Sequence, residues 1–253
     1  MSDRRRGIYL LPNLFTTGAM FAGFYAIVAA INHQYEPAAI AIFVAMILDG
    51  MDGRIARLTN TQSDFGMQYD SLSDLASFGL APALVMYQWA LSEMGKIGWM
   101  AAFIYAACGA LRLARFNTQA KSIDKRFFQG LPSPAAAAVI ASTIWLATDY
   151  GLVDGRNVLV FCLPVTILVG ILMVSNIRYH SFKQIDLKGR VPFMFIVFIC
   201  AVFALIAVQP PLMLFGMSTI YAISGPVLTL LTLRKHRAAR HTSEKDDTET
   251  LEN

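Results

Sequence analysis

The chain has few charged residues: only 15% of its 253 residues are Asp, Glu, Lys or Arg, against about 25% in an ordinary soluble domain. So few charges argue against a soluble globular protein. Hydrophobic residues make up 56% of the chain, and this composition predicts an integral membrane protein. We expect the lipid bilayer as its surroundings and no nucleic-acid partner.

Cysteine and histidine are also scarce. The three cysteines (Cys108, Cys162 and Cys200) all fall in apolar stretches, which excludes a disulfide framework and predicts buried, inert thiols. None of the four histidines lies near the acidic residues described below, so we assign them no role. The basic N-terminus precedes an apolar run without a small-residue cleavage site, which predicts a retained first span and not a cleaved signal peptide.

Eight apolar stretches approach the roughly 20 residues that a membrane-spanning helix needs. They are Leu10–Ile31, Ala38–Arg57, Asp70–Leu91, Ile97–Arg115, Pro134–Thr148, Val158–Asn176, Phe193–Val208 and Leu212–Leu233. The predicted fold class is therefore all-α, a polytopic membrane helical bundle of about eight transmembrane helices. The polar, charged tail at 235–253 is predicted to be disordered.

The positions of the basic residues orient this bundle. If the N-terminus is cytoplasmic and the spans alternate, all but two of the 21 Lys and Arg residues fall in cytoplasmic segments, the exceptions being Lys96 and Arg156. Positive charge gathers on the cytoplasmic side of membrane proteins. We therefore expect both termini in the cytoplasm, although one pair of spans more or fewer near the C-terminus would preserve the same bias.

Four aspartates stand out in this apolar chain. Asp49 and Asp52 are three residues apart, and Asp70 and Asp74 are four apart, so each pair lies on one face of a helix. The second and third spans are joined by a short cytoplasmic loop, which lets the two pairs face each other. Carboxylates in apolar spans are costly unless they bind a cation, so the pattern predicts a metal site at the membrane surface.

The chemistry of this site follows from its ligands. Two divalent cations would balance the four carboxylates, and oxygen-only ligands favour a hard ion such as Mg²⁺ or Mn²⁺. Two-metal sites serve in-line displacement at phosphorus. Arg57 adds a phosphate-binding guanidinium beside the cluster. Gly53 and Gly66 permit close approach of a ligand, or equally the tight packing of helices.

The whole stretch resembles a known signature. Asp49-x2-Asp52-Gly53-x2-Ala56-Arg57-x8-Gly66-x3-Asp70-x3-Asp74 is similar, at every fixed position, to the motif of the CDP-alcohol phosphotransferase family. The resemblance implies a six-span core at 1–190, followed by two further spans at 191–234. It also implies that Asp49, Asp52, Asp70 and Asp74 hold two metal ions, and that Asp74 is the general base.

Further stretches resemble the phosphatidylserine synthase branch of that family. They are Leu11–Thr16, Leu111–Asn117, Gly130–Ala137 and Met173–Tyr179. This resemblance implies transfer of a phosphatidyl group from CDP-diacylglycerol to L-serine by a homodimer in a bacterial inner membrane, with its active site facing the cytoplasm. The residues expected to bind CDP-diacylglycerol are Asn13, Thr16, Asp52, Gly53, Ala56, Arg57 and Gly66. Those expected to bind serine are Arg112, Arg115, Phe116, Asn117 and Ser133.

Alternatives remain at the level of sequence. Arg112 and Arg115 suit the carboxylate of serine and a phosphate, but equally suit plain cytoplasmic anchors. Another member of the family would use glycerol 3-phosphate or inositol phosphate as the acceptor. A transporter of divalent cations or phosphorylated solutes would also place acidic residues in spans. Its carboxylates would, however, be expected nearer the membrane midplane.

Overall fold

The structure is a computed structural model that describes residues 3–59, 61, 63–119, 127–152, 155–180 and 193–251. The basic residues expected in two cytoplasmic loops, Lys121, Lys125, Arg126, Lys183, Lys188 and Arg190, lie outside the described residues. Within those ranges the chain is almost entirely helical. The prediction of a helical membrane protein is confirmed.

Each predicted apolar stretch carries a helix. The long helices are α1 (Asp3–Ile31), α2 (Tyr35–Thr59), α3 (Asp64–Asp74), α4 (Ala81–Trp89), α5 (Lys96–Gln119), α6 (Ser133–Asp149), α7 (Leu159–Val174), α8 (Phe193–Val208) and α9 (Pro210–Leu251). A π-helical segment, η1 (Leu75–Leu80), joins α3 to α4, and short 3₁₀ turns lie at η2 (Leu91–Met94) and η3 (Gly155–Val158). The third predicted span thus begins on α3 and ends on α4.

One small feature is not helical. Strands β1 (Phe127–Gln129) and β2 (Arg178–His180) pair antiparallel, with Phe128 opposite Tyr179. The sequence analysis did not predict this ribbon. It joins the chain before α6 to the chain after α7, and so fixes the ends of both helices at the same side of the bundle.

Small residues allow the helices of the core to pack closely. Ala26 on α1, Ala38 and Ala45 on α2 and Ala81 on α4 are fully buried, as is common where helices meet in a membrane. A Cβ at Gly23 would overlap Ser77, so α1 lies directly against η1. Large apolar side chains such as Phe78 fill the rest of the core, whereas others such as Phe21 and Phe103 are exposed. The exposed ones suit a surface in contact with lipid, whose tails are equally apolar.

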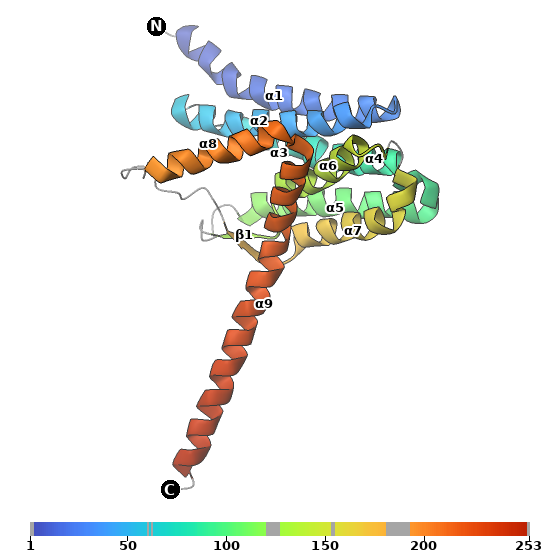
Figure 1. Cartoon of the computed structure of the whole chain (residues 1–253). Helices are drawn as coiled ribbons and strands as arrows, with labels where there is room; N and C mark the ends of the chain where they lie inside the picture. Colours follow the sequence, from blue (N-terminus) through green and yellow to red (C-terminus); the bar gives the residue numbers. More distant parts are fainter. Residues whose placement is uncertain are drawn as a thin grey trace.

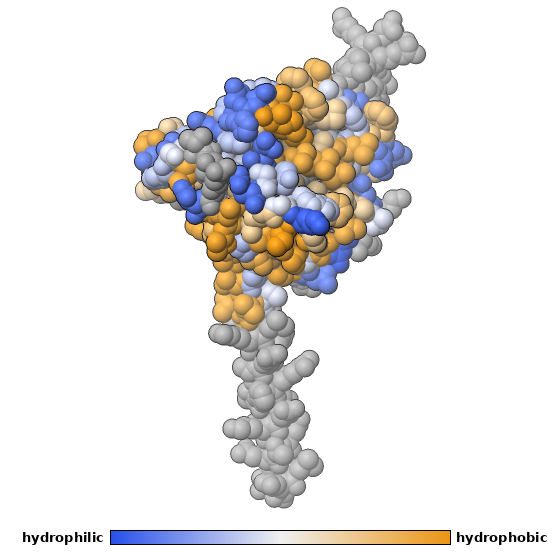
Figure 2. All heavy atoms as spheres, turned by 90° about the vertical axis from the view of Figure 1, so that its right-hand side faces the viewer, coloured by the Kyte–Doolittle hydropathy of each residue, from blue (hydrophilic) through white to orange (hydrophobic). Residues whose placement is uncertain are grey.

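The helices α1, α2, α5 and α7 lie alongside one another in Figure 1. Within the described ranges, three helical segments are long and apolar enough to cross a membrane: Pro12–Ile31, Lys96–Thr118 and Pro210–Leu231. Figure 2 looks onto the end of the bundle where α1 ends, and hydrophilic residues gather on this face with hydrophobic residues around them. Such a distribution is typical of a helix bundle whose short loops reach water.

The C-terminal helix extends past the last predicted span. Helix α9 continues to Leu251, and the disorder expected at 235–253 stays a prediction. Figure 1 also shows α9 crossing the other long helices and not running beside them.

Candidate active site

The two acidic pairs lie on α2 and α3, and the local sequence determines where α3 begins. Asp49 and Asp52 occupy the last turns of α2. Ser63 has an extended backbone (φ −139°, ψ 154°), and its hydroxyl accepts a 3.0 Å hydrogen bond from Gly66 N. This N-cap starts α3, which then carries Asp70 and Asp74 on one face.

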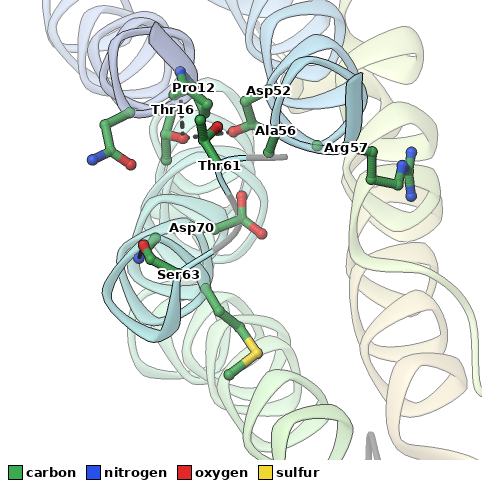
Figure 3. A pocket seen from close by; sticks show the side chains of 12 residues that line it. Pro12, Thr16, Asp52, Ala56, Arg57, Thr61, Ser63 and Asp70 are labelled. Carbon is green, nitrogen blue, oxygen red and sulfur yellow. Dashed lines mark hydrogen bonds between the residues drawn. The ribbon is translucent and has the colours of Figure 1, made fainter. Parts of the chain in front are cut away.

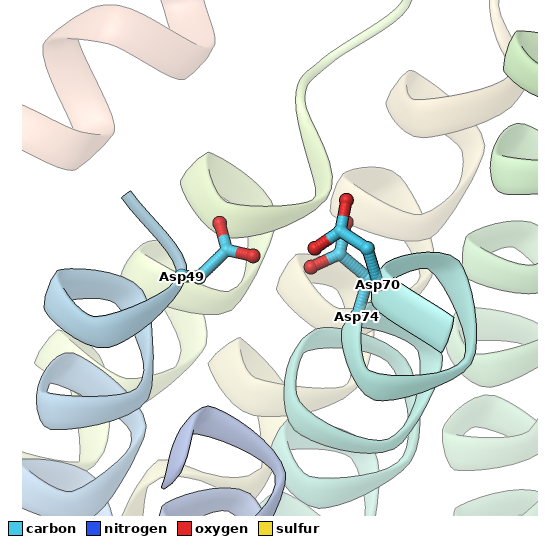
Figure 4. A group of neighbouring side chains, drawn as sticks. All are labelled: Asp49, Asp70 and Asp74. Atoms are coloured by element: carbon cyan, nitrogen blue, oxygen red, sulfur yellow. The ribbon is translucent and has the colours of Figure 1, made fainter. Parts of the chain in front are cut away.

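The acidic side chains meet across the α2–α3 gap. Single carboxylate oxygens of Asp49, Asp70 and Asp74 lie within 4.8 Å of one another, and Figure 4 shows Asp49 pointing from α2 toward the other two. Asp49 is in hydrogen-bonding contact with Asp74, and Asp52 with Asp70. The structure therefore brings all four predicted aspartates together.

This arrangement fits a divalent cation. Carboxylates so close together repel one another unless a positive charge lies between them. Asp74 Oδ1 is buried and has no hydrogen-bond partner in the described part of the chain, so it is left to accept a ligand. All donors are oxygens, which suits Mg²⁺ or Mn²⁺ better than zinc.

A cavity of about 270 Å³ adjoins the aspartates, between α1, α2 and the start of α3. All seven residues predicted to bind CDP-diacylglycerol line it: Asn13, Thr16, Asp52, Gly53, Ala56, Arg57 and Gly66. Figure 3 shows Thr16, Asp52, Thr61 and Asp70 converging on one another, while Arg57 extends away from them at the edge. Arg57 is exposed.

Sequence reasoning missed four residues of this cavity: Pro12, Thr61, Ser63 and Met67. Ser63 carried a signal, because a serine before a helical stretch is a typical N-cap. Thr61 carried none, since it lies in the short connection between α2 and α3 and enters the cavity only because the chain turns there.

Two of the predicted serine-binding residues lie together beside the aspartates. Arg112 on α5 is buried and donates a 2.8 Å hydrogen bond from Nη1 to Ser133 Oγ at the start of α6. Its guanidinium is also within electrostatic reach of Asp74. Arg112 is therefore close to the carboxylate cluster, and its hydrogen bond brings Ser133 beside it.

The structure gives the other three residues of that predicted set different contacts. Arg115 donates to Val174 O at 3.1 Å and to Asn176 Oδ1 at 2.6 Å, which ties α5 to the end of α7. Asn117 Nδ2 donates to Ser71 Oγ at 3.0 Å, joining α5 to α3. Phe116 is 49% exposed. The contacts of Arg115 and Asn117 therefore join α5 to neighbouring elements, and a role of the three residues in binding serine stays a prediction.

Comparison with known proteins identifies the family to which the chain belongs. The family model described as CDP-alcohol phosphatidyltransferase matches residues 9–172. The chain therefore belongs to the CDP-alcohol phosphatidyltransferase family.

Three similar proteins from different bacteria are named for the same activity. The chain is 38% identical over 228 residues to a CDP-diacylglycerol–serine O-phosphatidyltransferase of Helicobacter pylori (strain ATCC 700392 / 26695), covering 90% of this chain and 94% of the relative. It is 33% identical over 179 residues to the protein of that name from Bacillus subtilis (strain 168), covering 69% and 92%. A third, from Mycobacterium leprae (strain TN), is 34% identical over 219 residues, covering 84% and 72%.

Proposed function

We propose that this protein transfers the phosphatidyl group of CDP-diacylglycerol to L-serine and releases phosphatidylserine and CMP. The observation that carries the proposal is the meeting of four aspartates beside a cavity lined by all seven residues expected to bind the nucleotide–lipid. The relatives named for this reaction support serine as the acceptor.

The aspartates have the role of ligands. Asp49, Asp52, Asp70 and Asp74 would hold two divalent cations, Mg²⁺ or Mn²⁺. When bound, such ions stabilise negative charge on a transferring phosphate and on its leaving group. Asp52 is held in place by Thr16, whose hydroxyl donates a 2.7 Å hydrogen bond to Asp52 Oδ2.

The nucleotide–lipid would occupy the cavity between α1, α2 and α3. Gly53 lies on its wall with open space where a Cβ would be, so the cytidine diphosphate can approach the backbone of α2. Arg57 at the rim is exposed and long enough to turn toward a phosphate. The two acyl chains would remain in the bilayer.

Serine would enter from the opposite side, where Arg112 and Ser133 lie. The serine carboxylate would pair with the Arg112 guanidinium. This pairing would orient the serine hydroxyl toward the aspartates. The hydroxyl oxygen attacks the phosphorus that carries diacylglycerol, the bond from that phosphorus to CMP breaks, and Asp74 accepts the hydroxyl proton. Asp74 would be a weaker base with cations bound beside it, so we expect it to accept the proton late, after the new bond has begun to form.

Direct attack by serine explains the site without a covalent enzyme intermediate, because the nucleophiles within the described cluster are the aspartates that would ligate metal. In the absence of serine, we therefore expect no burst of CMP equal to the enzyme concentration. A stoichiometric burst would instead indicate a phosphatidyl-enzyme.

We also propose that the bundle crosses a bacterial inner membrane eight times, with both termini and the active site in the cytoplasm, and that it works as a homodimer. The distribution of Lys and Arg supports this orientation. The dimer is expected from the family resemblance. Helix α9 crosses the other long helices in Figure 1. For an eighth crossing, its apolar part, Pro210–Leu231, would have to reorient so that it runs beside them. A reporter fused after Asn253 that is active only in the cytoplasm tests the position of the C-terminus.

The reaction is tested by CMP release from CDP-diacylglycerol by purified protein in detergent with Mg²⁺ or Mn²⁺. L-Serine, glycerol 3-phosphate and inositol phosphate are supplied separately, with Asp70→Asn as the blank. Release with serine alone, lost in the variant and on chelation of the metal, is the expected result. Release with a different acceptor would keep the family and overturn the role of Arg112 and Ser133.

A further inference from the structure

The helix that carries Asp74 widens immediately after it. The π-helical segment η1 begins with the next residue, Leu75, and at its end the N–H of Ala81 donates to Ala76 O, five residues earlier. An α-helix makes this bond over four residues, and single π-helical turns inside α-helices occur frequently at functional sites. Asp74 thus lies at a change in helical twist, and the direction of its side chain depends on the turn that follows.

The sequence accounts for the wide turn through Pro82, the second residue of α4. Proline has no N–H to donate, and in an α-helix its ring collides with the carbonyl group four residues earlier. That carbonyl group belongs to Phe78. A wider turn before the proline gives the Phe78 oxygen room, but Pro82 cannot donate a hydrogen bond to it.

A tyrosine on α5 does so instead. Tyr105 is fully buried, and its hydroxyl donates a 3.1 Å hydrogen bond to Phe78 O. Phe78 is itself fully buried, and a carbonyl group that is buried without a donor is costly. Tyr105 therefore stabilises η1 in the wide form that the structure shows.

Contacts from two sides hold η1 in place. On the α5 side, a Cβ at Gly109 would lie 3.4 Å from Gly79 Cα, so the two backbones are close. On the α1 side, Ala19 O accepts a 3.0 Å hydrogen bond from Ser77 Oγ. Of these contacts, the bond from Tyr105 is the one that acts on a backbone carbonyl of η1 itself.

We propose that Tyr105 is a positioning residue for the transfer reaction: by holding Phe78 O it keeps η1 in its wide form, and so directs the Asp74 carboxylate toward the attacking hydroxyl. Phe78 lies one turn beyond Asp74, so the effect passes through the backbone and not through contact with a substrate. This inference rests on the proposed function, in which Asp74 is the base. It predicts a loss of turnover without a loss of binding.

The test is Tyr105→Phe, which keeps the buried ring and removes only the hydroxyl. CMP release is measured over ranges of serine and CDP-diacylglycerol concentration. Each rate is divided by the concentration of protein that binds CDP-diacylglycerol in calorimetry, so that unfolded protein does not count. We expect kcat to fall about 10-fold, because misplacement of a catalytic group by about 1 Å can cost as much as 10²-fold. Both KM values should stay within about 2-fold of wild type.

Tyr179→Phe is the matched control. Tyr179 is also fully buried, and its hydroxyl donates a 2.9 Å hydrogen bond to a backbone oxygen, that of Ala222. This bond joins β2 to α9, neither of which carries an aspartate of the cluster. Each variant loses one buried hydrogen bond, so the two should lose similar thermal stability, whereas only Tyr105→Phe should lower kcat. Equal falls in kcat, or an unchanged kcat in Tyr105→Phe, would overturn the proposal.

A second comparison separates the conformation of η1 from the packing around Tyr105. Pro82→Ala restores a backbone N–H that can donate to Phe78 O in an α-helical turn, so the tyrosine hydroxyl is no longer needed there. In the Pro82→Ala background we therefore expect Tyr105→Phe to change kcat less than about 2-fold, because the two residues act on one atom. A full fall of about 10-fold in both backgrounds would mean that Tyr105 does not act through Phe78 O.

Failure of the proposed function would give a different result. If wild-type protein released CMP only with another acceptor, serine would be the wrong acceptor, and the tyrosine variants would be compared with that acceptor instead. If wild-type protein released CMP with no acceptor, the proposed function would be wrong and this inference would fail with it, before any variant was compared.

Discussion

Thr16 on α1 donates a hydrogen bond of 2.7 Å to Asp52 on α2, and both side chains are buried. This bond joins the wall of the cavity between α1, α2 and α3 to the carboxylate cluster, because Asp52 is also in contact with Asp70. The neighbouring Ser73 on α3 donates to the backbone oxygen of Thr16 at 3.0 Å. One turn of α1 therefore sets the spacing of the two helices that carry the aspartates.

Thr16→Val tests this relationship. The substitution keeps the shape of the side chain and removes its donor, which leaves Asp52 less well oriented. Hydrogen bonds to charged groups contribute about 1.5–3 kcal/mol, so we expect kcat/KM for CDP-diacylglycerol to fall roughly 10- to 100-fold. Thr17→Val is the control, because the Thr17 hydroxyl bonds to Tyr69 OH on α3 at 2.8 Å and not to an aspartate. Equal losses in the two variants would show that α1 packing, and not the bond to Asp52, is responsible.

Substitution of Gly53 tests whether CDP-diacylglycerol approaches the backbone of α2. A Cβ at Gly53 meets nothing within 4 Å, and the same holds at Gly50 one turn earlier on α2. Either alanine should therefore leave the fold intact and favour the helix by up to about 1 kcal/mol. Only Gly53 lines the cavity, so we expect Gly53→Ala to raise the KM for CDP-diacylglycerol at least 10-fold and Gly50→Ala to leave it unchanged. Unchanged kinetics for Gly53→Ala would place the nucleotide elsewhere.

Asp74→Asn distinguishes a role of Asp74 as general base from a role as metal ligand. The amide keeps the shape of the side chain but cannot accept the proton, and loss of a general base costs typically 10²- to 10⁴-fold in rate. We expect turnover to be lost while CDP-diacylglycerol still binds, as measured by calorimetry in detergent. If binding disappeared together with turnover, Asp74 would act mainly as a metal ligand.

The features that could be predicted follow from short-range patterns in the sequence. Long apolar stretches located the helices, and the spacing of Asp49, Asp52, Asp70 and Asp74 placed them on facing helix sides. The connection between α2 and α3 is short, so their aspartates cannot lie far apart, and both helices pack against α1. Hence the cluster and the cavity beside it could be predicted from the sequence.

What the sequence could not supply depends on distant contacts. Strands of three residues, such as β1 and β2, are too short to show an alternating pattern. The bond from Arg115 to Asn176 joins residues 61 positions apart, and nothing local in the sequence indicates that pairing.

The crossing of α9 itself can be tested at Gly225. A methyl group there would overlap the Tyr179 ring, and that ring has little room to move because it is fully buried and its hydroxyl is bonded to Ala222 O. Overpacking of this kind costs typically about 1–3 kcal/mol, so we expect Gly225→Ala to lower the melting temperature in detergent. Gly216→Ala on the same helix, where a Cβ meets nothing within 4 Å, should not lower it, because alanine favours helix over glycine. Equal melting temperatures for the two variants would mean that α9 does not rest on Tyr179.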